Sequence, residues 1–83
     1  MNCLIAFDST QQALRAEMLL EYAEIEIDIR PTPKEITAGC ALSIEFDEAD
    51  IEQVRSIIAE EAVEIRGIYI HKQDKYVPYS ESV

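Results

Sequence analysis

Glycine, sulfur and basic side chains are all scarce in this sequence. Its 83 residues contain two glycines, two cysteines, one histidine and no tryptophan, and seven basic residues stand against seventeen acidic ones. So few glycines leave no glycine-rich loop that could cradle a phosphate. The net charge of −10 repels nucleic acids and anionic membranes, so we expect neither as a partner. A chain this short has material for one core only.

The scarcity of sulfur and histidine also limits redox and metal chemistry. Cys3 and Cys40 are too few for a disulfide framework, so we expect two free thiols in a reducing compartment. Small domains that bind soft metals often carry Cys-x-x-Cys after the first strand, but the corresponding residues 8–11 contain no sulfur. His71, in a predicted strand, is typical of a solvated surface residue. We therefore expect no metal and no cofactor.

Long apolar runs are absent as well. None approaches the roughly 20 residues that a transmembrane helix needs. The first residues, Met1–Asp8, lack a positively charged start and are interrupted by an acid, so we expect no signal peptide. These features predict a cytoplasmic protein.

The pattern of apolar residues predicts the element order β-α-β-β-α-β. Apolar residues alternate over 3–7, 25–29 and 42–46, and they recur at helical spacing over 11–24 and 51–58. Acids before residue 51 suit the start of the second helix. Val63 to Ile70 reads as the last strand, with a β-bulge at Gly67 where the alternation changes phase. We place the domain at 1–72 and expect a polar tail over 73–83.

The commonest arrangement of this order is the ferredoxin-like α+β sandwich, a four-stranded antiparallel sheet with two helices on one face. In that topology the first and third strands are antiparallel neighbours. The connection between the second and third strands then lies at the end where the first strand finishes. The second strand alternates isoleucine with charged residues over 25–30, which is typical of a sheet edge that discourages pairing with other chains.

The stretch from Pro31 to Cys40 is hard to explain by packing alone. Pro31 and Pro33 restrict the backbone and force a corner after the second strand. Thr32 and Glu35 have the spacing of a capping box, with Pro33 at the first helical position, which predicts one helical turn. The segment therefore reads as a rigid bracket in front of a thiol.

Gly39 would end that turn and bring Cys40 to the start of the next strand. The predicted topology places Cys40 near Ser9 and Thr10, at the amino end of the first helix. Unpaired amides there lower the pKa of a thiol, and Lys34 adds a nearby cation, whereas Asp8 and Glu35 are near enough to oppose the effect, so the sequence leaves its direction open. The simpler alternative is that Cys40 is a small buried residue, as we expect for Cys3 inside its apolar strand.

Two segments carry a resemblance to a known family. Phe7-Asp8-Ser9-Thr10, and Pro31-Thr32-Pro33-Lys34-Glu35-Ile36-Thr37 leading to Cys40, resemble the selenium/sulfur carrier-like family of small bacterial and archaeal proteins. The resemblance implies a carrier, without turnover of its own, that accepts sulfur or selenium on Cys40 as a persulfide or selenosulfide. It implies partners such as a cysteine desulfurase or a selenium-pathway enzyme.

A second class of function stays open at this point. Small domains of this topology also serve as interaction or ligand-sensing modules, often as pairs of identical chains. Under that interpretation Cys40 would be unreactive. The rate of its alkylation against pH discriminates between the two classes.

Overall fold

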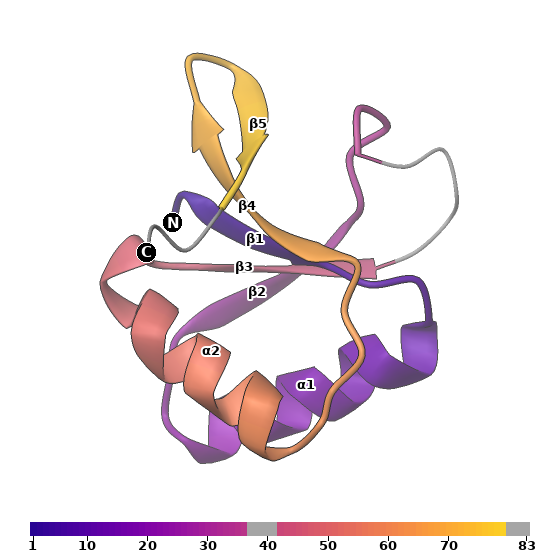
Figure 1. Ribbon diagram of the computed structural model, residues 1–83, viewed down its shortest axis with the longest axis vertical. Coiled ribbons are helices and arrows are strands. Elements are labelled where there is room, and N and C mark those ends of the chain that lie inside the picture. Colours follow the sequence, from indigo (N-terminus) through magenta and orange to yellow (C-terminus); the bar gives the residue numbers. More distant parts are fainter. Residues whose placement is uncertain (37–41, 80–83) are drawn as a thin grey trace.

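The computed structural model of the protein describes residues 1–36 and 42–79. Within these ranges the strands are β1 (Cys3–Ala6), β2 (Ile27–Pro31), β3 (Leu42–Phe46), β4 (Gly67–Lys72) and β5 (Lys75–Pro78). The α-helices are α1 (Thr10–Tyr22) and α2 (Ile51–Glu60), and one 3-10 turn, η1 (Glu48–Asp50), precedes α2. Both helices lie on one face of the sheet (Figure 1). The protein is thus an α+β sandwich, as predicted.

The two helices begin and end for different local reasons. The Ser9 hydroxyl caps α1 by accepting a hydrogen bond from the Gln12 amide at 3.4 Å. Both helices end in a left-handed residue that is not glycine, Glu24 with φ 61° and Ala62 with φ 53°. The following amide then bonds back to the helix, as Val63 N does to the Ile58 carbonyl oxygen at 3.0 Å. A chain with two glycines caps its helices with strained residues instead.

The core lies between the helices and the sheet. Every second residue of the central strands points toward the helices, and these side chains are aliphatic or aromatic. The buried cluster comprises Cys3, Ile5, Phe7, Ala13, Ala16, Leu20, Ile25, Ile44, Phe46, Ile51, Val54, Ile58, Val63 and Ile70. Small residues on α1 let that helix lie close to the strands. No helix in the described ranges is long and apolar enough to cross a membrane.

The sheet differs from the predicted one in its strand count. It has five strands in the order β2-β3-β1-β4-β5, and every neighbouring pair is antiparallel. The predicted four-stranded sheet is therefore wrong. The fifth strand comes from residues expected in the tail, and it closes a tight hairpin in which Gln73 and Asp74 both have positive φ.

The last predicted strand also begins later than expected. Val63 is buried and Ile65 packs against the core, but neither belongs to a strand. Strand β4 starts at Gly67, which pairs directly with Ala6, and its register is regular from there to Ile70. The Arg66 amide donates to the same Ala6 carbonyl oxygen at 2.7 Å, so the irregularity predicted at Gly67 lies just before the strand. The change of phase in the sequence marks the end of a connection, not a defect within a strand.

Candidate functional site

The candidate site surrounds the end of the sheet where β1 finishes. Ala6 at the end of β1 lies opposite Ser43, and Pro31 at the end of β2 lies opposite Leu42. Strand β2 therefore ends, and β3 begins, where the chain leaves β1 for the start of α1. This confirms that the first and third strands are antiparallel neighbours. Cys40 and Gly39 fall outside the described residues, and so does their predicted position.

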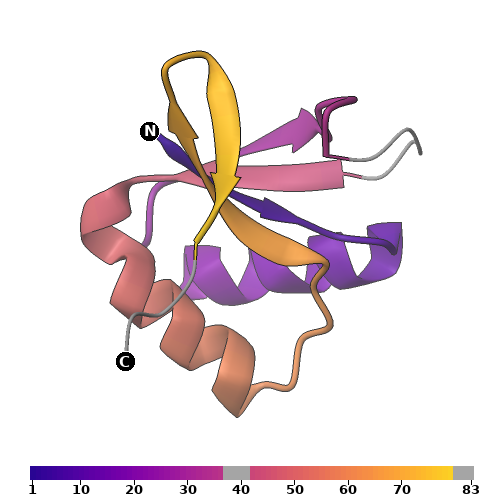
Figure 2. The ribbon, with the colours of Figure 1, turned by 45° about the horizontal axis from the view of Figure 1, so that its top comes forward.

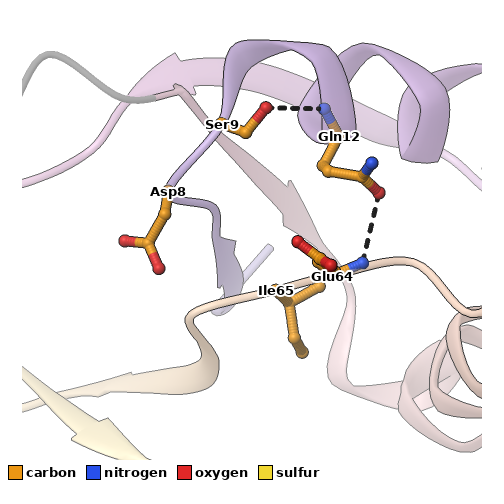
Figure 3. Close-up of a pocket in the computed structure, with 5 residues that line it drawn as sticks. All are labelled: Asp8, Ser9, Gln12, Glu64 and Ile65. Carbon is orange, nitrogen blue, oxygen red and sulfur yellow. Dashed lines mark hydrogen bonds between the residues drawn. The ribbon is translucent and has the colours of Figure 1, made fainter.

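The amino end of α1 is tied to the connection that follows α2. Ser9 caps the helix, and Thr10 is its exposed first residue. The Gln12 side chain reaches out of the helix, and its Oε1 accepts a hydrogen bond from the Glu64 amide at 3.2 Å (Figure 3). The side chain of Gln12 thus fixes the connection before β4 against α1.

A shallow pocket lies between these two segments. It has a volume of about 270 Å³ and is lined by Asp8, Ser9, Gln12, Glu64 and Ile65. Figure 3 shows the cap bond from Gln12 N to Ser9 and the bond from Glu64 N to Gln12 that bridges the two segments. Two carboxylates line the pocket, which makes it a poor place for a free anion. Among the described residues, no three His, Cys, Asp or Glu side chains group closely enough to hold a metal ion.

Asp8 is paired with a cation that the sequence did not point to. The Arg66 guanidinium Nη1 lies 2.8 Å from Asp8 Oδ1, and the Arg66 amide donates to the Ala6 carbonyl oxygen at 2.7 Å. Fifty-eight residues separate the two partners in sequence, so no local motif could have found the pair. The negative charge of Asp8, which would oppose a nearby thiolate, is therefore balanced by its neighbour.

The bracket has a different internal structure from the predicted one. The Thr32 and Ser43 hydroxyl oxygens lie 2.6 Å apart, and both side chains are buried. Ile36 N donates to the half-buried Pro33 carbonyl oxygen at 3.0 Å, which closes a turn over residues 33–36. The predicted capping box is wrong, because Thr32 bonds across the strands and no bond joins it to Glu35 within the described chain.

The charged residues of the bracket point to solvent. Lys34 is exposed. Glu35 is also exposed, and its Oε2 accepts a hydrogen bond from the Tyr76 amide of β5 at 3.4 Å. The hairpin, part of which the sequence predicts as a tail, therefore contacts the segment that precedes Cys40. Pro31, exposed at the end of β2, completes the described part of the bracket.

Cys3 is excluded as a working thiol. Its side chain is 1% exposed on the helix-facing side of β1. Burial first, and then the charges of Glu48 and Asp47, raise the pKa of Cys3 from 9.0 to about 11. Such a thiol is protonated at neutral pH and out of reach of reagents. This agrees with its predicted packing role.

The fold and this end of the sheet define a small α+β protein whose second thiol follows a proline-rich corner. The chain belongs to the family described as "Putative Se/S carrier protein-like", whose model matches residues 2–70. The family predicted from Phe7–Thr10 and Pro31–Cys40 is thereby confirmed. Searches of curated proteins and of solved structures found no match.

Proposed function

We propose that this protein carries sulfur or selenium on Cys40, as a persulfide or selenosulfide. The family match carries the proposal, because it spans the segment from Pro31 to Cys40. The burial of Cys3 supports it. The sequence has two cysteines, and because Cys3 is sealed in the core, Cys40 is the thiol left for the carrier role. The ion pair of Arg66 with Asp8 supports it further, because it neutralises an acid at the sheet end where β2 and β3 meet the start of α1.

The proposed step is a sulfur transfer without net oxidation. The Cys40 thiolate attacks the outer sulfur of a donor persulfide, R–S–SH. The new bond joins Cys40 Sγ to that sulfur, the S–S bond of the donor breaks, and the donor leaves as the thiolate R–S⁻. A selenosulfide forms in the same way from a donor that carries selenium in the outer position. Unloading repeats the step with an acceptor thiol.

Intact-protein mass spectrometry tests the loading. We expect a cysteine desulfurase with L-cysteine to add about 32 Da, the mass of one sulfur atom, to the wild type. The variant Cys40→Ser should gain nothing, and Cys3→Ser should load like the wild type. Inorganic polysulfide serves as a donor that needs no protein contact. If polysulfide loads Cys40→Ser as well as the wild type, the proposal fails.

Alkylation kinetics test the reactivity of the thiol itself. We expect iodoacetamide to modify Cys40 with a half-maximal rate at a pH below 8.5, the pKa of an ordinary thiol. Cys3 should react only after unfolding. A Cys40 that is no faster than a model thiol at every pH would contradict the carrier function and favour an interaction module.

We take β1 to β4 with the two helices as a ferredoxin-like unit to which β5 is added. We propose a cytoplasmic location, and a cysteine desulfurase or selenium-pathway enzyme as partner. The order of strands β2-β3-β1-β4 supports the first point, and the net charge of −10 supports a protein partner over a nucleic acid.

A further inference from the structure

Strand β2 ends the sheet on one side. The strand order β2-β3-β1-β4-β5 leaves β2 with one neighbour, and Figure 2 shows that neighbour and the open side. An edge strand offers unpaired amides and carbonyl groups to another strand. Which groups face outward can be worked out from the register.

Along a strand inside the sheet, successive residues bond alternately to the neighbour on one side and on the other, and the bonds of β4 show which residues face which neighbour. His71 N donates to the Asn2 carbonyl oxygen at 2.8 Å, so Asn2 and the residues two and four places on bond toward β4. Ile5 therefore bonds on its other side, toward β3. The bond from Tyr79 N to the Ile68 carbonyl oxygen at 2.7 Å agrees, because it makes Ile68 face β5 and leaves its neighbours to face β1.

The same alternation passes through β3 to β2. Ile44 lies opposite Ile5 and bonds toward β1, so Ser43 bonds toward β2, where it lies opposite Arg30. Ile29 and Pro31 must then direct their backbone groups away from the sheet. The position of Pro31 fits this independently, since a proline in a sheet is tolerated where its missing amide hydrogen would face solvent.

We propose that two copies of this chain pair through β2, antiparallel, about a two-fold axis at Ile29. In this register Ile29 exchanges both backbone bonds with Ile29 of the second copy. Ile27 donates to the carbonyl oxygen of Pro31 in the second copy, and the proline, which cannot donate, only has to accept. The two sheets become one continuous sheet.

The charges of β2 select this register. Asp28 of each copy lies opposite Arg30 of the other, in the pair type whose side chains approach most closely. Both side chains are more than half exposed, and Arg30 already contacts Asp28 at 3.5 Å and Glu45 at 2.8 Å within its own chain. A shift by two residues in either direction would oppose Asp28 to Asp28 or Arg30 to Arg30. Edge charges that deter other partners are thus complementary to a second copy.

The apolar side of β2 also gains from the pairing. Ile27 and Ile29 point toward the helices and pack against the core while remaining partly exposed. A second β2 beside them covers part of that surface. The inference does not rest on the carrier function, because no residue of the bracket beyond Pro31 takes part.

Charge reversal tests the proposal by sedimentation equilibrium of the full chain at physiological ionic strength. We expect a dimeric wild type and at least about a tenfold weaker association in Asp28→Arg and in Arg30→Asp. The double variant Asp28→Arg, Arg30→Asp should restore the dimer, because it exchanges the charges without changing the pattern. Glu60→Arg, an exposed position at the end of α2, changes the net charge as Asp28→Arg does and should leave association unchanged.

Amide hydrogen exchange of the wild type gives a second readout that needs no variant. The amides of Asp28 and Arg30 should be protected at every concentration, while those of Ile27 and Ile29 should become protected only as the protein concentration rises. The proposal is overturned if the wild type is a monomer throughout. It is also overturned if Asp28→Arg leaves the dimer intact, if the double variant fails to restore it, or if Met18→Glu on the exposed side of α1 abolishes it instead.

Discussion

The two faces of the sheet are both covered, but by different kinds of contact. Toward the helices, Ile5, Ile44 and Phe46 are fully buried among other apolar side chains. On the other face, Leu4 and Ser43 are equally buried although α1 and α2 both lie on the opposite side of the sheet. One face is held by packing that any apolar residue of similar size supports, whereas the other depends on particular partners.

The partners on the second face carry polar groups and join neighbouring strands. The Thr32 and Ser43 hydroxyls meet at 2.6 Å, and Arg30 pairs with Glu45 at 2.8 Å. The rings of His71 and Tyr76 stack with centroids 4.5 Å apart. The first contact holds the start of the bracket to β3, and the last joins β4 to β5. The face away from the helices is thus the one with the more specific contacts.

The largest expected difference in stability is between substitutions at two consecutive residues of β3. Phe46→Ala removes a fully buried ring from the helix-facing core and should lower the free energy of unfolding by about 3–5 kcal/mol. Glu45→Ala, one residue away on the other face, loses an ion pair with Arg30 and should cost about 1 kcal/mol or less. Urea denaturation followed by circular dichroism measures both. Equal losses would contradict the division of the two faces.

Alkaline pH should weaken the helix-facing side through Cys3. Burial raises the pKa of Cys3 in the folded protein from 9.0 to about 11. Because the folded state holds this proton more tightly, the contribution is complete below pH 9 and is lost as pH rises toward 11, by up to about 3 kcal/mol.

The variant Cys3→Ala isolates this contribution, because all other titrating groups are shared with the wild type. Its free energy of unfolding should fall less steeply than that of the wild type between pH 9 and 11. Urea midpoints at several pH values give the two slopes. Parallel slopes would mean that ionisation of the Cys3 thiol is not opposed by burial.

The hydroxyl pair tests the second face. Thr32→Val leaves the Ser43 hydroxyl buried without this partner, and Ser43→Ala does the same to Thr32, so each should cost about 1–3 kcal/mol. The double variant removes both polar groups and should cost clearly less than the sum of the two. A double-mutant cycle in urea measures the coupling. Additive losses would show that the two hydroxyls do not depend on one another.

Sequence periodicity predicted the parts of the fold that local packing determines. Both helices, and strands β1 to β3, lie within about two residues of their expected bounds. Periodicity did not predict β5, because the hairpin that leads into β5 has Gln73 and Asp74 at positive φ. Glycine at these positions would have indicated a turn. Periodicity assigned Val63 and Ile65 to a strand because burial alone looks the same in a connection.

The candidate site was predicted less completely, for a related reason. Thr32 and Glu35 have the spacing of a capping box, but their partners are Ser43 and Tyr76, and the latter is 41 residues from Glu35. The partner of Asp8 is equally remote. A short-range motif predicts the hydrogen bonds that a segment would form in isolation. In this protein, contacts with other parts of the fold replace those local bonds.

The smallest predicted effect concerns the residues that end the helices, where backbone strain lowers the stability of the well-packed helical layer. Ala62 follows α2 with φ 53°, a conformation in which its methyl group is strained and glycine is not. Ala62→Gly should therefore raise the free energy of unfolding by about 0.5–1 kcal/mol, although glycine also gains entropy in the unfolded chain. Ala59→Gly, inside the same helix, should instead lower it by a similar amount. Thermal denaturation of the pair gives opposite shifts if backbone strain at the cap outweighs chain entropy, and a loss in both would place the entropy term above the strain.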